Sequence, residues 1–252
     1  MLGLNLMGES FSVFTLPFAA IFLALSFFLL SLFFRQEKKD SNPILDIALL
    51  KSKPFLAANL YNMIIGAGVF AIFAFVPLYA TSVHGLSTLM SGMILTPRSL
   101  GIIPASAITS FLLRRWGYRW PMVLGLTLIS LATLLLSLRP QLWKMMGIDL
   151  GIAEILAFLI MLSGIGMGIA LPASNNACIE LMPEKVATIT GLRGMFRTVG
   201  GALGVSLITI ILHSTSDLAN GFRITFISFG LGLLFAIPLV FFMPAGKKEA
   251  KI

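Results

Sequence analysis

Seven long apolar segments constrain the fold of this chain more than any other feature of its sequence. A helix needs about 20 predominantly apolar residues to cross the hydrocarbon core of a membrane. Short connections separate the segments, and no soluble domain is inserted between them. The fourth is short and needs help from its flanks. The segments are Ser12–Phe34, Phe55–Thr81, Ser91–Leu113, Pro121–Leu138, Glu154–Ser174, Thr190–His213 and Phe222–Met243. We therefore predict an all-α integral membrane protein with seven transmembrane helices.

The composition excludes several other classes of protein. Of the residues, 58% are hydrophobic and 11% are charged, against about a quarter charged in soluble domains. The net charge of +8 comes from short basic clusters between apolar segments, a distribution that favours membrane topology over nucleic-acid binding. The single cysteine, Cys178, provides no disulfide framework and is expected to be a packing residue. We find no catalytic constellation, metal-ligand cluster or nucleotide-binding loop, so we expect no enzyme activity, metal or cofactor.

The placement of Lys and Arg predicts the orientation of the chain, because basic loops resist translocation. One side carries only Arg139, Lys144 and Arg223. The first, third and fifth loops and the C-terminal tail carry Arg35, Lys38, Lys39, Lys51, Lys53, Arg114, Arg115, Arg119, Lys185, Arg193, Lys247, Lys248 and Lys251. We predict a multi-pass protein of the cell (inner or plasma) membrane, with its N-terminus outside and its C-terminus in the cytoplasm. An outside N-terminus without an export signal is expected of a piece of a larger transporter.

Two of the predicted spans resemble each other. Residues 91–101 and 190–200 share a frame of Ser or Thr before Gly, followed by Arg, Ser or Thr, an apolar residue and Gly. The two spans run in opposite directions, which is typical of the inverted repeats of secondary transporters. We predict an accessory helix and cytoplasmic linker over residues 1–54. A bundle of two inverted three-helix repeats, with a short cytoplasmic tail, would follow over residues 55–252. Chance similarity between two glycine-rich helices is the alternative.

Polar residues inside the spans are candidate cavity residues. Arg98 and Arg197 each lie seven residues into a span, and an intramembrane arginine usually faces a cavity or a partner. We expect Arg98 to face the bundle interior, and Arg197 either to do the same or to reach the nearer interface. Asn62 is a candidate donor to a substrate, and an interhelical hydrogen bond is an equal alternative. No acidic residue lies deep in any span, and His84 and His213 are near the outer surface. A proton-coupling acid must therefore lie elsewhere.

Glycines are concentrated in the fifth and sixth spans. Gly164 and Gly168 form one Gly-x-x-x-Gly spacing and Gly200 and Gly204 form another. This spacing lets two helix backbones approach closely. We predict tight helix packing at both pairs, with a sliding contact as the less favoured interpretation.

The order of these motifs resembles the major facilitator superfamily, and within it the fourteen-span drug:proton antiporters of the EmrB/QacA type. The segment 92–101 with its Pro97-Arg98 pair, the segment 164–172 and the segment 196–204 resemble three of that family's C-terminal helices. The segment 110–119 is similar to the superfamily's cytoplasmic Gly-x-x-x-Asp-Arg-x-Gly-x-Arg loop, with Ser110 in place of the first Gly and Arg114 in place of the Asp. Arg115, Gly117 and Arg119 would then be its gating residues.

The resemblance implies that the seven spans are helices eight to fourteen of a transporter whose N-terminal bundle is not in this chain. The leading hypothesis is the C-terminal half of a proton-coupled efflux antiporter for drugs or other small amphipathic compounds. Its partners would be that substrate, protons, the lipid bilayer and an N-terminal half or a second copy. Two alternatives stay open: a non-transporting membrane interaction subunit, and an inactive truncated gene product.

Overall fold

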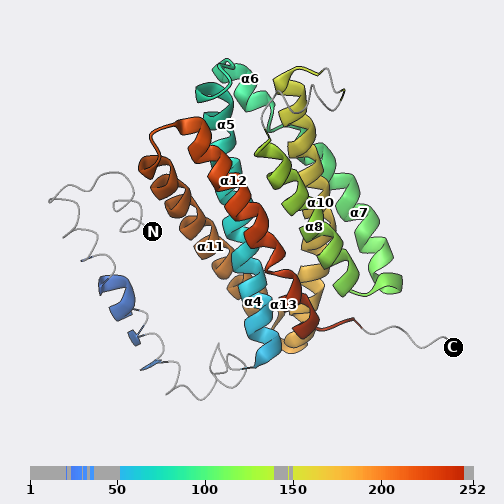
Figure 1. The fold of residues 1–252 in the computed structure, drawn as a ribbon. Coiled ribbons are helices and arrows are strands. Elements are labelled where there is room, and N and C mark those ends of the chain that lie inside the picture. Colours follow the sequence, from blue (N-terminus) through green and yellow to red (C-terminus); the bar gives the residue numbers. More distant parts are fainter. Residues whose placement is uncertain are drawn as a thin grey trace.

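The structure, a computed structural model, describes residues 21, 24–29, 31–32, 35–36, 52–138, 147 and 150–246. Every regular element in residues 52–246 that it describes is a helix, and these helices lie side by side in a bundle (Figure 1). In chain order the elements are α4 (Lys53–Ile65), the π-helical segment η1 (Gly66–Ala71), α5 (Ile72–Ser82), α6 (Thr88–Met93), α7 (Pro97–Trp116), α8 (Arg119–Leu136), α10 (Ile152–Leu181), the short 3-10 helix η2 (Pro183–Lys185), α11 (Val186–Ser214), α12 (Leu218–Leu234) and α13 (Ile237–Phe242).

Five helical segments within the described ranges are long and apolar enough to cross a membrane. They are Lys53–Ser82, Arg119–Leu136, Ile152–Leu181, Pro183–Ser214 and Leu218–Phe242, and they coincide with the second, fourth, fifth, sixth and seventh predicted spans. The first predicted span, Ser12–Phe34, lies mostly outside the described residues. The predicted division after residue 54 falls in the first turn of α4, which begins at Lys53.

The third predicted span, Ser91–Leu113, is divided in two by Pro97. A proline has no backbone N–H, and its ring clashes with the carbonyl four residues earlier, here that of Met93. Helix α6 accordingly ends at Met93, a turn covers residues 94–96, and α7 begins at Pro97. The turn is held by i→i+3 bonds, such as the one from the Thr96 N–H to the Met93 carbonyl at 3.0 Å. Because α7 also carries polar and basic residues, it is not among the five strongly apolar segments.

The main helix contacts are those of α10 with α7 and α8, of α8 with α12, and of α11 with α4 and η1. Helix α7 lies along α10, and α10 also contacts α8. Helix α8 packs against α12, while α11 lies along α4 and η1 (Figure 1). The first and second halves of the bundle therefore interlock, because α7 packs on α10 and α11 packs on α4.

Aromatic side chains and a few hydrogen bonds join the helices in the core. Tyr61 is fully buried and donates its hydroxyl to the Met122 carbonyl at 3.4 Å. Tyr79 donates to the Leu136 carbonyl at 3.3 Å and packs against Phe222 and Phe226, with ring centroids 5.1 and 5.0 Å away. These contacts tie α4 and α5 to α8 and α12. In a membrane such bonds hold helices together without competition from water.

The outside of the bundle is apolar. Phe111 is 82% exposed and Phe235 is 79% exposed, and many other large apolar side chains also point outward. Monomeric soluble proteins rarely expose contiguous apolar surface on this scale. The outer surface is therefore suited to lipid.

Glycines set how closely the helices approach each other. A Cβ on Gly200 would clash with the Met63 carbonyl of α4, and one on Gly66 would clash with the Arg197 carbonyl of α11. At the other contact, a Cβ on Gly164 would clash with the Arg98 carbonyl of α7. In each case the obstacle is backbone, which cannot rotate away as a side chain can. The two interlocking contacts therefore require glycine.

Gly200→Ala should destabilise the chain, whereas Gly194→Ala on the same helix should not. The added methyl at residue 200 has no space, and overpacking of this kind costs about 1–3 kcal/mol. Nothing lies within 4 Å of a Cβ on Gly194, where Ala should stabilise the helix by about 0.5–1 kcal/mol. Thermal unfolding of both variants in lipid nanodiscs measures the difference. Equal stability of the two variants would contradict the close approach at Gly200.

Candidate functional site

Two arginines lie at the points where the interlocking helices cross. The Arg98 backbone of α7 meets Gly164, and the Arg197 backbone of α11 meets Gly66. Gly164 is near the middle of the 30-residue helix Ile152–Leu181, and Gly66 is near the middle of the 30-residue helix Lys53–Ser82. At 1.5 Å per residue, each arginine backbone is within about 4 Å of the level of that midpoint. Counting residues from the start of each predicted span placed both arginines closer to a helix end.

The guanidinium of Arg98 lies between two helices. Its central carbon is 3.8 Å from the ring centroid of Phe73 on α5, and Nη2 is 3.4 Å from the Met167 sulfur on α10. Its Nε is buried and has no hydrogen-bond partner in the described residues. A cation held over an aromatic face gains electrostatic attraction from the ring. The Met167 sulfur is a weak acceptor, and Nε has none among the described residues, so the hydrogen-bonding capacity of this guanidinium is largely unused there.

The guanidinium of Arg197 lies near the junction of η1 and α5, beside the same continuous helix that the Arg98 guanidinium contacts. Its central carbon is 5.5 Å from the ring centroid of Phe70 on η1, three residues before Phe73. Arg193, one turn earlier on α11, interacts electrostatically with Arg197 and keeps a buried Nε without a partner. Positive side chains from α7 and α11 therefore converge on the segment at which η1 passes into α5.

No carboxylate balances these charges within the described part of the chain. Glu154 lies in the first turn of α10, Glu180 in its last turn, Glu184 in η2, and Asp217 caps the N-terminus of α12. All four are at helix ends, whereas the arginines are at the level of helix midpoints. An arginine at the centre of a membrane helix costs ~2.5–3.5 kcal/mol on insertion scales. We call Arg98, Arg197, Phe70, Phe73 and Met167 the arginine site.

The π-helical segment η1 shapes this site. Single π-helical turns inside α-helices are rare and occur frequently at functional positions. Here the segment Gly66–Ala71 holds Gly66 and Phe70, so it provides both the close contact with α11 and one of the two aromatic rings. The sequence analysis missed this segment and both rings. Gly66 precedes Gly164 by 98 residues, close to the 99-residue offset of the internal repeat, so the repeat could have indicated Gly66 as a second crossing glycine.

Asn62 is fully buried and contacts α10. Its side-chain amide donates to the Ala58 carbonyl at 2.7 Å and contacts the Cys178 sulfur of α10 at 3.7 Å. Of the two roles expected for this residue, the placement corresponds to an interhelical contact. The Oδ1 of Asn62 and the nearby Ser174 hydroxyl have no partner among the described residues. Cys178 itself is buried between the helices, as expected for a packing residue.

The predicted packing glycines lie at close helix contacts. A Cβ on Gly168 would be 2.6 Å from the Ile102 carbonyl of α7, and one on Gly204 would be 2.6 Å from the Ala67 carbonyl of η1. Gly164 and Gly200 make the crossings described above. Gly66, Gly101 and Gly125 also lie against backbone atoms of neighbouring helices, and the sequence analysis did not predict these contacts.

The loop between α7 and α8 docks onto the chain segment after α13. Arg119 donates from Nη2 to the Met243 carbonyl at 3.1 Å, and the Tyr118 N–H donates to the Ala245 carbonyl at 3.0 Å. Gly117 adopts φ +66°, and a Cβ on it would clash with the Ala245 carbonyl. Arg115 is exposed. Partial burial, together with the Glu180 carboxylate, raises the pKa of Tyr118 above its ordinary value, so the phenol stays neutral.

His84 lies just beyond the end of α5 at Ser82. Its ring is edge-on to Tyr79, with centroids 4.7 Å apart, and its Nε2 is buried without a partner in the described residues. Burial lowers the pKa of His84 below its ordinary value. The imidazole is therefore neutral at physiological pH.

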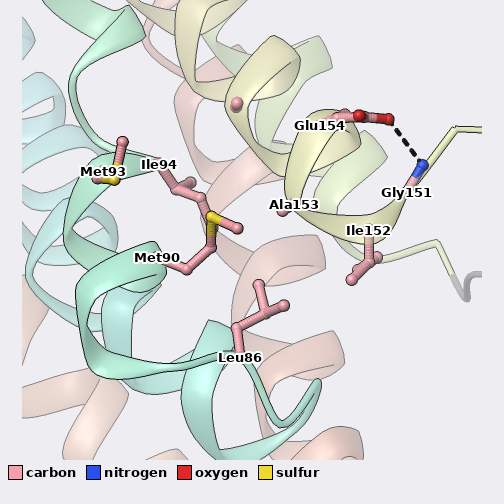
Figure 2. A pocket seen from close by; sticks show the side chains of 9 residues that line it. Leu86, Met90, Met93, Ile94, Gly151, Ile152, Ala153 and Glu154 are labelled. Atoms are coloured by element: carbon pink, nitrogen blue, oxygen red, sulfur yellow. Dashed lines mark hydrogen bonds between the residues drawn. The ribbon is translucent and has the colours of Figure 1, made fainter.

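A separate cavity of about 480 Å³ lies where α10 begins. Figure 2 shows that Leu86, Met90, Met93 and Ile94 face Ile152 and the other residues at the start of α10 across it. The Glu154 carboxylate at its edge accepts a hydrogen bond from the Gly151 N–H at 2.9 Å. That carboxylate caps its own helix, and the rest of the lining is apolar.

Comparison with known proteins assigns a family. The model of the Major Facilitator Superfamily matches residues 6–205 and, in a second overlapping match, residues 92–252. The chain is 28% identical to the multidrug transporter protein MdtP of Bacillus subtilis (strain 168) over 182 residues, which cover 71% of this chain and 32% of that protein. It is 27% identical to the quinolone resistance protein NorB of Staphylococcus aureus (strain MRSA252) over 254 residues, which cover 97% of this chain and 53% of NorB. The chain thus spans about half of NorB and a third of MdtP.

Gly117→Ala should destabilise the chain more than Gly85→Ala. Both glycines have φ +66°, a conformation that costs a residue with a side chain about 1–3 kcal/mol. Gly85 has no neighbour within 4 Å, whereas residue 117 also faces the Ala245 carbonyl. Thermal unfolding gives the two losses, and hydrogen exchange at residues 243–246 reports release of the docked segment. Unchanged exchange in Gly117→Ala would contradict the docking.

Proposed function

The chain belongs to the Major Facilitator Superfamily, and from this we propose that it forms the C-terminal half of a proton-coupled efflux transporter for drugs or other small amphipathic compounds. It is a multi-pass protein of the plasma membrane and a member of a transporter family, not an enzyme. The observation that carries the proposal is the alignment of 97% of the chain with 53% of a quinolone resistance protein.

The proposed transporter works by alternating access between two bundles, of which this chain provides one. Residues 55–252 form that bundle, and residues 1–54 form an accessory helix and a linker. The bundle consists of two inverted repeats, with α4 to α8 as the first and α10 to α13 as the second. Two pairs of close contacts support this division: Gly66 with Arg197 and Gly164 with Arg98, and then Gly200 with Met63 and Gly101 with Met161. The corresponding residues of the two contacts in each pair are 98 or 99 positions apart: Gly66 and Gly164, Arg98 and Arg197, Met63 and Met161, and Gly101 and Gly200.

The other half of the transporter supplies what this half lacks. A proton-coupled carrier needs a titratable group within the membrane, and the described carboxylates of this chain lie at helix ends. The coupling acid therefore belongs to an N-terminal six-helix half, because a second copy of this chain would lack it as well. Substrate and protons would exchange between the two bundles, beside Arg98 and Arg197.

The proposed orientation predicts the behaviour of reporters fused to the chain. A reporter that is active only in the cytoplasm should be active when fused after Lys251 and inactive when inserted at Gly85, because the basic loops stay on the cytoplasmic side. Activity of the two fusions in cells, at equal expression, makes the measurement. The reverse pattern would overturn the orientation.

Transport should require both halves. In cells that lack related pumps, this chain alone should give no proton-linked dye efflux, because its described span interiors hold no carboxylate. Co-expression with an N-terminal six-helix half should give efflux that an uncoupler abolishes. A matched control is the same pair with Gly200→Ala, which disrupts the crossing of α11. Uncoupler-sensitive efflux by the chain alone would contradict the half-transporter assignment, and no efflux by the pair would favour a non-transporting subunit.

A further inference from the structure

The arginine site carries positive charge, and none of the carboxylates that the structure describes lies beside it. The central carbons of the Arg98 and Arg197 guanidiniums lie 3.8 and 5.5 Å from the ring centroids of Phe73 and Phe70, which are three residues apart on one helix. We propose that these two guanidiniums bind a carboxylate, so that the transporter recognises amphipathic compounds bearing a carboxylate group. The inference rests on the proposed function for the identity of the ligand as a substrate, but the site itself can be tested by binding alone.

The charge distribution points to an anion as the occupant. Arg98 and Arg197 lie at the level of helix midpoints, and Arg193 adds a third positive charge one turn from Arg197. The carboxylates that the structure describes are all at the ends of helices. Buried or membrane-embedded arginines are normally paired. A cationic compound would be repelled by this half of the transporter, whereas an anionic or zwitterionic compound would be attracted.

The available atoms favour a carboxylate in particular. Arg98 Nε has no hydrogen-bond partner among the described residues, and Arg98 Nη2 contacts the Met167 sulfur, which is a weak acceptor. The edge of a guanidinium matches a carboxylate with two parallel hydrogen bonds. Phe70 is 43% exposed, so its ring is available to the apolar part of the same compound.

The carboxylate has two conceivable sources: a transported compound, or an acidic side chain of the other half of the transporter. Both satisfy the same guanidinium edges, so the chemistry of the site is the same in either case. Binding to this chain in the absence of the other half tests the chemistry. Repeating the measurement with both halves present then distinguishes the sources.

The experiment compares an aromatic acid with its neutral amide. Titration calorimetry measures naphthalene-2-carboxylate and naphthalene-2-carboxamide binding to the chain in lipid nanodiscs. We expect the acid to bind roughly 10- to 100-fold more tightly than the amide, the ratio expected for charge-assisted hydrogen bonds. Arg98→Gln and Arg197→Gln should each remove most of that ratio, and Arg98→Lys should restore only part of it because ammonium lacks the planar fork. Arg114→Gln is the matched control, since Arg114 is exposed in the last turn of α7.

Two outcomes would overturn the inference: equal binding of acid and amide, or unchanged acid binding in both glutamine variants whose thermal unfolding matches that of the parent chain. With both halves present, retained binding identifies the compound as the source of the carboxylate. Loss of binding identifies an acidic side chain of the other half, and the carboxylate site still stands. A transporter that exports dyes but fails this test would keep its proposed function and lose only the carboxylate selectivity.

Discussion

The close approach of helix backbones at two crossings is the constraint on which the rest of this bundle depends. Gly66 and Gly200 bring α11 against α4 and η1, and Gly164 brings α10 against α7. In lipid there is little hydrophobic driving force between helices, so association relies on packing and on interhelical hydrogen bonds. Glycine is the residue that allows backbone-to-backbone contact. These contacts interlock the two halves of the bundle and fix the positions of the crossing helices, and of their side chains, along the bundle axis.

The arginines are positioned by those same crossings. Their own carbonyls are the atoms that face Gly164 and Gly66, so neither helix can slide toward an interface without losing its packing. The guanidiniums therefore stay in the bundle, within cation–π distance of Phe73 and Phe70. The insertion cost of two such charges is a stability penalty that packing must offset. Residues kept at such a cost are commonly functional, which is consistent with a role in binding.

The helix α4–η1–α5 links packing and function within one element. Its π-helical turn carries Gly66 for the crossing and Phe70 for the arginine site, while Tyr61 and Tyr79 on either side bond to α8. Asn62 contacts Cys178 on α10. A change in the crossing of α11 would therefore move the aromatic rings next to the guanidiniums. The packing of α11 and the surroundings of the two arginines are thus set by the same helix.

The sequence by itself determined that the chain lies in lipid, that it is helical, where five of the spans lie and that the Gly-x-x-x-Gly pairs pack helices together. It could do so because the length of an apolar segment and the spacing of small residues are local features of a sequence, and both govern how helices cross and pack in a membrane. The internal repeat also pointed to Arg98 and Arg197 as corresponding residues. Only the tertiary structure decided the π-helical turn, the burial of Asn62 and the depth of the arginines. Depth depends on which helix crosses which and at what level, so counting from a helix end could not give it. Phe70, Phe73 and Met167 were missed for the same reason, since an apolar residue in an apolar helix carries no mark of the charge that will lie beside it.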